Sequence, residues 1–229
     1  MDYTNDRGMG FRSFPPVTLN LLIINGLVFL AGLIPAFSEF IQMYFPLWYP
    51  LWPLQDESFF AGADVPVLLQ KIPYQFITHM FTHADFFHLF FNMFGLWMFG
   101  AVVENYWKEK KFLVYYLVCG LGAAGIYVAT LYIADTPGLR PMIGASGALY
   151  GVLLAYGFMF PNNIIYLNFF FPLKAKYWIM ILIGFDLVAG FANRAGDNVA
   201  HFAHIGGALT GLLILLYWRK KGRLYWKNF

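Results

Sequence analysis

The stretch GASGALYGVLLAYGFMF occupies residues 144–160, and its length limits how the whole chain can fold. Its apolar residues begin at Ser146 and stop before Pro161. A helix over 146–160 is roughly 22 Å long, whereas the hydrocarbon core of a bilayer is about 30 Å thick. In a membrane, the backbone over 141–145 must therefore dip below the surface. Such backbone is tolerated only where it is buried or lines a water-filled cavity.

The composition makes a lipid bilayer the expected surroundings. Of the 229 residues, 60% are hydrophobic and only 12% are charged, whereas soluble domains average about 25% charged residues. These values argue against a soluble enzyme and against a disordered chain. The net charge of +3 is too small to indicate a nucleic-acid partner. The single cysteine, Cys119, allows no internal disulfide.

Six apolar stretches predict an all-α fold, a polytopic membrane bundle of six transmembrane helices with a long outer first loop. One domain is expected over residues 1–229, without a separate soluble domain. A helix of about 20 residues crosses a membrane, so each stretch is a candidate span. The predicted spans cover 17–36, 85–104, 112–134, 146–160, 176–192 and 199–218.

The positions of Lys and Arg predict the orientation of this bundle. With six spans, 12 of the 15 basic residues fall on the side that both termini share. The positive-inside rule then places both termini in the cytoplasm and residues 37–84 outside. We expect an integral protein of a prokaryotic plasma or inner membrane. The aromatic, proline-broken part of the outer segment, 45–53, is interpreted either as an interfacial anchor or as a region that admits substrate.

Polar side chains inside predicted spans are functional candidates, because they are costly in a membrane. Ser146 begins the fourth span, where free N–H groups and the helix dipole favour an anion. His204 lies about 9 Å into the sixth span, and Asn92 lies about 10 Å into the second. His88 is one turn above Asn92 on the same helix face. The three helices run in parallel, so these residues can share one layer below the outer surface.

Glycine spacing predicts close packing of the two helices that carry Ser146 and His204. The fourth span contains Gly147-x3-Gly151, and the sixth contains Gly207-x3-Gly211. Small residues four apart let helix backbones approach closely in membranes. Each pair begins within one turn of a reactive side chain, which favours contact between the serine and the histidine.

These motifs resemble those of the rhomboid family of intramembrane serine proteases, and the resemblance covers essentially the whole chain. One departure is Tyr74-Gln75, where many relatives have a Trp-Arg pair, and it affects the expected structure of the outer loop. The motifs that carry the resemblance are His88-x3-Asn92, Gly144-x-Ser146-Gly147 and Ala203-His204-x-x-Gly207.

The resemblance implies a role for each matched residue. Ser146 would be the nucleophile and His204 its general base, a dyad without an obligatory carboxylate. His88, Asn92 and the backbone N–H of Ser146 would line the oxyanion hole, and Tyr150 would pack on the histidine ring. The substrates would be peptide bonds in or near transmembrane segments of single-span or polytopic membrane proteins. No cofactor is implied, and the oligomeric state stays open.

Several readings compete with these roles. His201, one turn before His204, is the alternative base. A metal held by His79, His83 and His88 is disfavoured because no H-E-x-x-H pattern is present, so no metal is expected and these loop histidines are expected to bond backbone. Asp186, inside the fifth span, receives no catalytic role.

Two other functions remain as alternatives. A catalytically silent relative that binds client transmembrane helices should lack the serine or the histidine, and this chain has both. A small transporter or channel is disfavoured because neither an inverted repeat nor paired broken helices are found.

Overall fold

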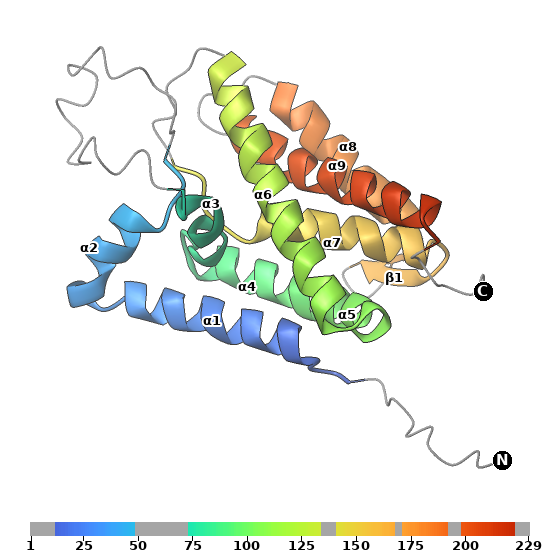
Figure 1. Cartoon of the computed structure of the whole chain (residues 1–229), viewed down its shortest axis with the longest axis horizontal. Coiled ribbons are helices and arrows are strands. Elements are labelled where there is room, and N and C mark those ends of the chain that lie inside the picture. Colours follow the sequence, from blue (N-terminus) through green and yellow to red (C-terminus); the bar gives the residue numbers. More distant parts are fainter. Residues whose placement is uncertain (1–11, 49–72, 134–140, 168–170, 192–197, 223–229) are drawn as a thin grey trace.

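The computed structural model is a bundle of helices that surrounds a short central helix (Figure 1). It describes residues 12–48, 73–133, 141–167, 171–191 and 198–222. The helices are α1 (Pro16–Gly32), α2 (Pro35–Tyr44), α3 (Gln75–Thr78), α4 (Phe86–Gly95), α5 (Ala101–Trp107), α6 (Glu109–Ile133), α7 (Ser146–Met159), α8 (Ala175–Phe191) and α9 (Asn198–Lys220). A 3-10 turn, η3 (His79–Phe81), follows α3, and a π-helical segment, η4 (Leu96–Gly100), joins α4 to α5.

Three helical segments are long and apolar enough to cross a membrane. They are Phe86–Trp107, Glu109–Ile133 and His201–Lys220, and they overlap three of the predicted spans. A fourth crossing is possible if α1 and α2, which meet at 116°, are taken as one broken span. Helix α7 has 14 residues and α8 has 17. By length the described residues therefore provide three to four crossings, and the number six stays a prediction.

The first helix ends a few residues before the end of the first predicted span, 17–36. Helix α1 stops at Gly32, and α2 begins at Pro35 in a new direction. Proline fixes φ and lacks an N–H, so it fits the first turn of a new helix. At the other end of α1, the buried Glu104 carboxylate accepts hydrogen bonds from the backbone N–H groups of Val17 and Thr18 at 2.8 and 2.7 Å. These bonds pair donors that a helix N-terminus leaves unsatisfied.

The fold is not purely α-helical. Strands β1 (Ile164–Leu167) and β2 (Phe171–Lys174) form an antiparallel hairpin where the sequence predicts a loop between the fourth and fifth spans. In Figure 1 this hairpin lies at the same end of the bundle as α5 and the end of α9. At that end Lys111 stacks over the Trp218 ring, with its Nζ 4.5 Å from the ring centroid. The described parts of the predicted basic loops thus share one end of the molecule.

Helices α7 and α9 contact each other through their glycines. A methyl group at Gly207 would collide with the backbone carbonyl of Gly147, and one at Gly151 would lie 3.2 Å from the Gly207 carbonyl. The Tyr115 hydroxyl of α6 donates a hydrogen bond to the Gly151 carbonyl at 2.8 Å. The predicted close approach of the two helices is confirmed, and α6 supports it from the side (Figure 1).

The outer loop is held by Gln75, at the position where the sequence departs from the expected Trp-Arg pair. This buried side chain donates from Nε2 to the Tyr44 carbonyl at 3.3 Å and accepts from the Trp48 N–H at 3.4 Å. Thr78 donates to the Phe45 carbonyl at 2.8 Å. The first part of 45–53 is therefore tied to α3, and residues 49–53 lie outside the described part of the chain.

Replacement of Gly207 by alanine is expected to lower the stability of the folded protein. The added methyl group forces α7 and α9 apart, and overpacking of this kind costs about 1–3 kcal/mol. The matched control is Gly125→Ala, because a methyl group at this exposed helical glycine would meet no atom within 4 Å. Thermal unfolding in detergent should show a lower midpoint for Gly207→Ala only. Equal midpoints for the two variants would contradict the close contact.

Candidate active site

Ser146 lies at the first position of α7, after a turn that the loop backbone enforces. Gly144 has φ of +105°, a conformation that L side chains rarely adopt. Its N–H donates to the His79 carbonyl at 2.8 Å, and Met142 pairs with Leu47 in an isolated β-bridge. The first N–H groups of a helix have no partner within it. The serine therefore sits beside backbone donors that can bind an oxyanion.

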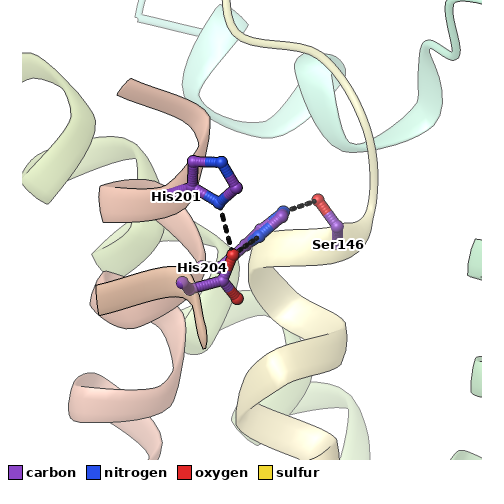
Figure 2. Close-up of polar contacts among 4 residues, drawn as sticks. Ser146, His201 and His204 are labelled. Atoms are coloured by element: carbon purple, nitrogen blue, oxygen red, sulfur yellow. Dashed lines mark hydrogen bonds and ion pairs between the residues drawn. The ribbon is translucent and has the colours of Figure 1, made fainter. Parts of the chain in front are cut away.

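His204 of α9 contacts the serine directly. Its Nε2 lies 2.8 Å from Ser146 Oγ, within hydrogen-bonding range (Figure 2). The Tyr150 ring, one turn further along α7 from the serine, stacks on the imidazole with centroids 4.4 Å apart and planes 9° apart. The glycine contact between α7 and α9 thus brings these three side chains together, and the stacking fixes the plane of the imidazole.

Asp186 of α8 lies behind the histidine. Its Oδ1 is 3.4 Å from His204 Nδ1 and 2.5 Å from His201 Nδ1, so one oxygen of this buried side chain faces both rings. A carboxylate can only accept, so it favours a proton on each Nδ1. In His204 that tautomer leaves Nε2 free to accept the serine proton. The sequence assigns Asp186 no catalytic role, and the structure shows that it bonds to histidines of the neighbouring helix α9.

His201, the alternative base, does not contact Ser146. Its ring centroid is 6.4 Å from that of His204, and its Nδ1 is directed at Asp186. The i,i+3 spacing places the two rings on one side of α9. His201 is therefore a neighbour of the base.

His88 and Asn92 lie on α4, which begins after Asp85. The Asp85 side chain accepts from the His88 N–H at 2.9 Å and caps the helix. His88 Nδ1 accepts from the Ala84 N–H at 3.3 Å, which places the proton of a neutral ring on Nε2. A methyl group built on Gly144 would lie 2.6 Å from His88 Nε2 and 3.8 Å from Ser146 Oγ. His88 Nε2 therefore lies against Gly144, in the loop just before the serine.

Asn92 completes the set of predicted site residues. This buried amide donates from Nδ2 to the His88 carbonyl at 2.8 Å. An amide nitrogen carries two protons, so one N–H remains for another acceptor. The structure therefore brings Ser146, His204 and Tyr150 into contact, and it places His88 beside the serine, with Asn92 one turn further along α4.

The remaining histidines, His79 and His83, pack beneath the outer loop. His79 Nδ1 bonds the Gln75 carbonyl at 2.9 Å, in agreement with the predicted backbone role. Both His83 ring nitrogens are buried without a hydrogen bond among the described residues, and its ring packs edge-on against His88. Burial lowers the pKa of His79 to about 4 and that of His83 to about 3, the latter helped by the neighbouring His88. Both rings are therefore neutral near pH 7.

Comparison with known proteins identifies the family. A family model described as the Rhomboid domain matches residues 70–221, which is well over half of the chain. The chain belongs to the rhomboid family. The matched region contains α4, α7 and α9, and therefore every predicted site residue of this rhomboid protein.

Relatives of this rhomboid protein come from mitochondria and from a bacterium. The Arabidopsis thaliana protein RHOMBOID-like protein 12, mitochondrial, is 32% identical over 60% of this chain and 44% of its own length. Rhomboid protein 1, mitochondrial, of Saccharomyces cerevisiae is 33% identical over 58% of this chain and 38% of its own length. YdcA of Bacillus subtilis, named as a candidate rhomboid protease, is 30% identical over 66% of this chain and 71% of its own length. These relatives do not support a specifically prokaryotic membrane.

The matches span less than half the length of the two mitochondrial relatives.

The contact of Asp186 with the two histidines was not predicted from the sequence. The available signal was the coincidence of an acidic residue in an apolar span with two histidines at i,i+3 spacing in the next span. That pattern does not reveal which way the aspartate points, because this depends on how α8 rotates against α9.

Proposed function

We propose that this rhomboid protein is a serine endopeptidase that cleaves peptide bonds in or near transmembrane segments of membrane-protein substrates. The observation that carries the proposal is the 2.8 Å separation of Ser146 Oγ and His204 Nε2. Serine is a weak nucleophile until a positioned base takes its proton. Family membership and the protease name of the bacterial relative support the same reaction class.

The proposed reaction begins with attack of Ser146 Oγ on the scissile carbonyl while its proton moves to His204 Nε2. The resulting oxyanion is stabilised by the Ser146 N–H, by the Nε2–H of His88 and by the amide of Asn92. Each such donor contributes about 3–4 kcal/mol in other acyl-transfer sites. His204 then gives its proton to the leaving amine, and a water molecule hydrolyses the acyl-enzyme.

Asp186 acts in this proposal as a positioning residue. It keeps the proton of His204 on Nδ1 and stabilises the imidazolium that forms when the serine is deprotonated. Tyr150 stacks on one face of the His204 ring and fixes its plane, whereas Asp186 fixes which ring nitrogen carries the proton.

We further propose that substrates approach from the end of the bundle that carries α2 and α3, opposite the basic end. At that end α7 begins, and the short length of α7 predicts that its start lies below the membrane surface. His204 keeps 22% of its side chain exposed. With the basic end in the cytoplasm or its equivalent compartment, the serine opens to the opposite face. The outer loop held by Gln75 then borders the route to the serine.

Labelling with a fluorophosphonate probe tests the serine and its base. We expect the purified wild type in detergent to be labelled, and Ser146→Ala and His204→Ala to lose labelling by about a thousand-fold or more, because neither nucleophile nor base works alone. Ser38→Ala on α2 is the control and should label as the wild type does. Failure of the folded wild type to react would favour the silent binder of client helices.

Substitution of Asp186 by asparagine tests the positioning role. Asparagine keeps the shape but no longer enforces the Nδ1–H tautomer, so we expect the labelling rate to fall about ten-fold or more. Asp186→Glu should recover part of the rate because it restores an acceptor. Unfolding midpoints of the variants serve as the control. A wild-type rate in a folded Asp186→Asn protein would refute the role.

The sequence of a target helix should control how fast it is cleaved. A helix hides its carbonyls in hydrogen bonds, and each unpaired backbone group costs several kcal/mol in lipid. We expect replacement of Gly or Pro near the cleaved bond by Leu to slow cleavage in proteoliposomes, measured as product on a gel. The same replacement two helical turns away is the control. Equal rates for both substrates would refute local unwinding.

A further inference from the structure

Three metal-ligating side chains converge on one point behind the serine. They are Asp186 of α8 and the pair His201 and His204 of α9, each with one ligand atom within 4.8 Å of the others (Figure 2). The second carboxylate oxygen of Asp186, Oδ2, is buried and accepts no hydrogen bond of good geometry from the described residues, and Tyr150 is the other side chain that interacts with this carboxylate. An unpaired buried oxygen is costly and is an available ligand.

The two histidine nitrogens and the Asp186 oxygen suit a transition-metal ion of intermediate softness. Two imidazole nitrogens and one carboxylate oxygen are the ligands that Zn²⁺ takes, whereas Mg²⁺ and Ca²⁺ prefer oxygen ligands. Zinc bonds of about 2.0–2.2 Å require ligand atoms roughly 3.3 Å apart. The 2.5 Å and 3.4 Å contacts of Asp186 with the two histidines bracket that spacing, and the two histidine ligand atoms lie within 4.8 Å of each other.

A cation can reach this cluster from the side of the histidines. The His201 and His204 side chains are 16% and 22% exposed, whereas that of Asp186 is 3% exposed. Asp186 therefore lies on the buried side of the cluster, and the two imidazole rings lie on its exposed side. A three-ligand set of this kind leaves a fourth position for water.

Binding of zinc to His204 Nδ1 would reverse the tautomer that catalysis needs. A neutral imidazole whose Nδ1 holds a metal carries its proton on Nε2. That Nε2–H can only donate, so it cannot take the proton of Ser146. The same ion would also occupy Asp186, which otherwise orients the ring. Zinc at this point is therefore an inhibitor of the serine and has no part in the reaction itself.

We propose that Asp186, His201 and His204 form a zinc-binding site whose occupation switches Ser146 off. The inhibition rests on the proposed protease function, whereas the binding does not. The two parts are therefore tested separately, with binding measured in a protein that cannot react.

The binding test uses full-length, untagged Ser146→Ala protein in detergent, titrated with Zn²⁺ by calorimetry and by metal analysis after dialysis. We expect about one zinc per chain. A His201→Asn substitution in this background should weaken binding about ten-fold or more, since loss of even an outer-shell partner costs that much. His83→Gln is the matched control, because His83 lies outside the cluster. Binding that is lost with His83→Gln and kept with His201→Asn would overturn the proposed site.

The inhibition test follows fluorophosphonate labelling of the wild type in Zn²⁺ and in Mg²⁺. We expect Zn²⁺ alone to slow labelling and EDTA to restore it. In His201→Asn the half-inhibitory zinc concentration, measured against that variant's own metal-free rate, should rise about ten-fold or more. Loss of labelling in EDTA would overturn the inhibitory role. An unlabelled wild type that still binds zinc would remove the protease function and leave the site in place.

Discussion

The contact between the backbones of α7 and α9 is the constraint on which the site depends. Gly147 and Gly207 let the two helices approach until a single added methyl group would collide. Only at this separation can a short side chain such as serine reach an imidazole on the neighbouring helix at 2.8 Å. A pair of larger residues would keep the helices several ångströms apart and leave the serine without a base. The serine–histidine contact and the packing of the two helices are therefore the same structural feature.

The Asp186 carboxylate next to His204 controls which nitrogen of that ring carries the proton. One Asp186 oxygen faces both His201 and His204, so the state of this cluster decides which nitrogen of His204 is basic. With the carboxylate as partner, Nε2 is free to accept a hydrogen bond from the serine, whereas under the proposed metal binding at Nδ1 it would not be. Tyr150 holds the ring plane in either case. The His204 ring is thus positioned by packing, and its tautomer is set by hydrogen bonding.

The sequence predicted much of the fold because the bilayer imposes simple rules of length and polarity. The start of α7 at Ser146, the short length of that helix and the position of His204 within α9 follow from apolar runs and breaks in the chain. The end of α1 and the β1–β2 hairpin did not follow. A bend at Pro35 and a turn between short strands depend on local backbone geometry, which hydropathy does not report.

The sequence by itself determined the family, the nucleophile and base candidates and the glycines that bring them together, because each is a residue type at a fixed spacing along one helix. The tertiary structure decided that Asp186 faces the histidines, that Gln75 holds the outer loop and that Glu104 caps α1. These contacts join residues that are distant in sequence. Their partners depend on the rotation of whole helices against each other, which many side chains set together and no local pattern encodes.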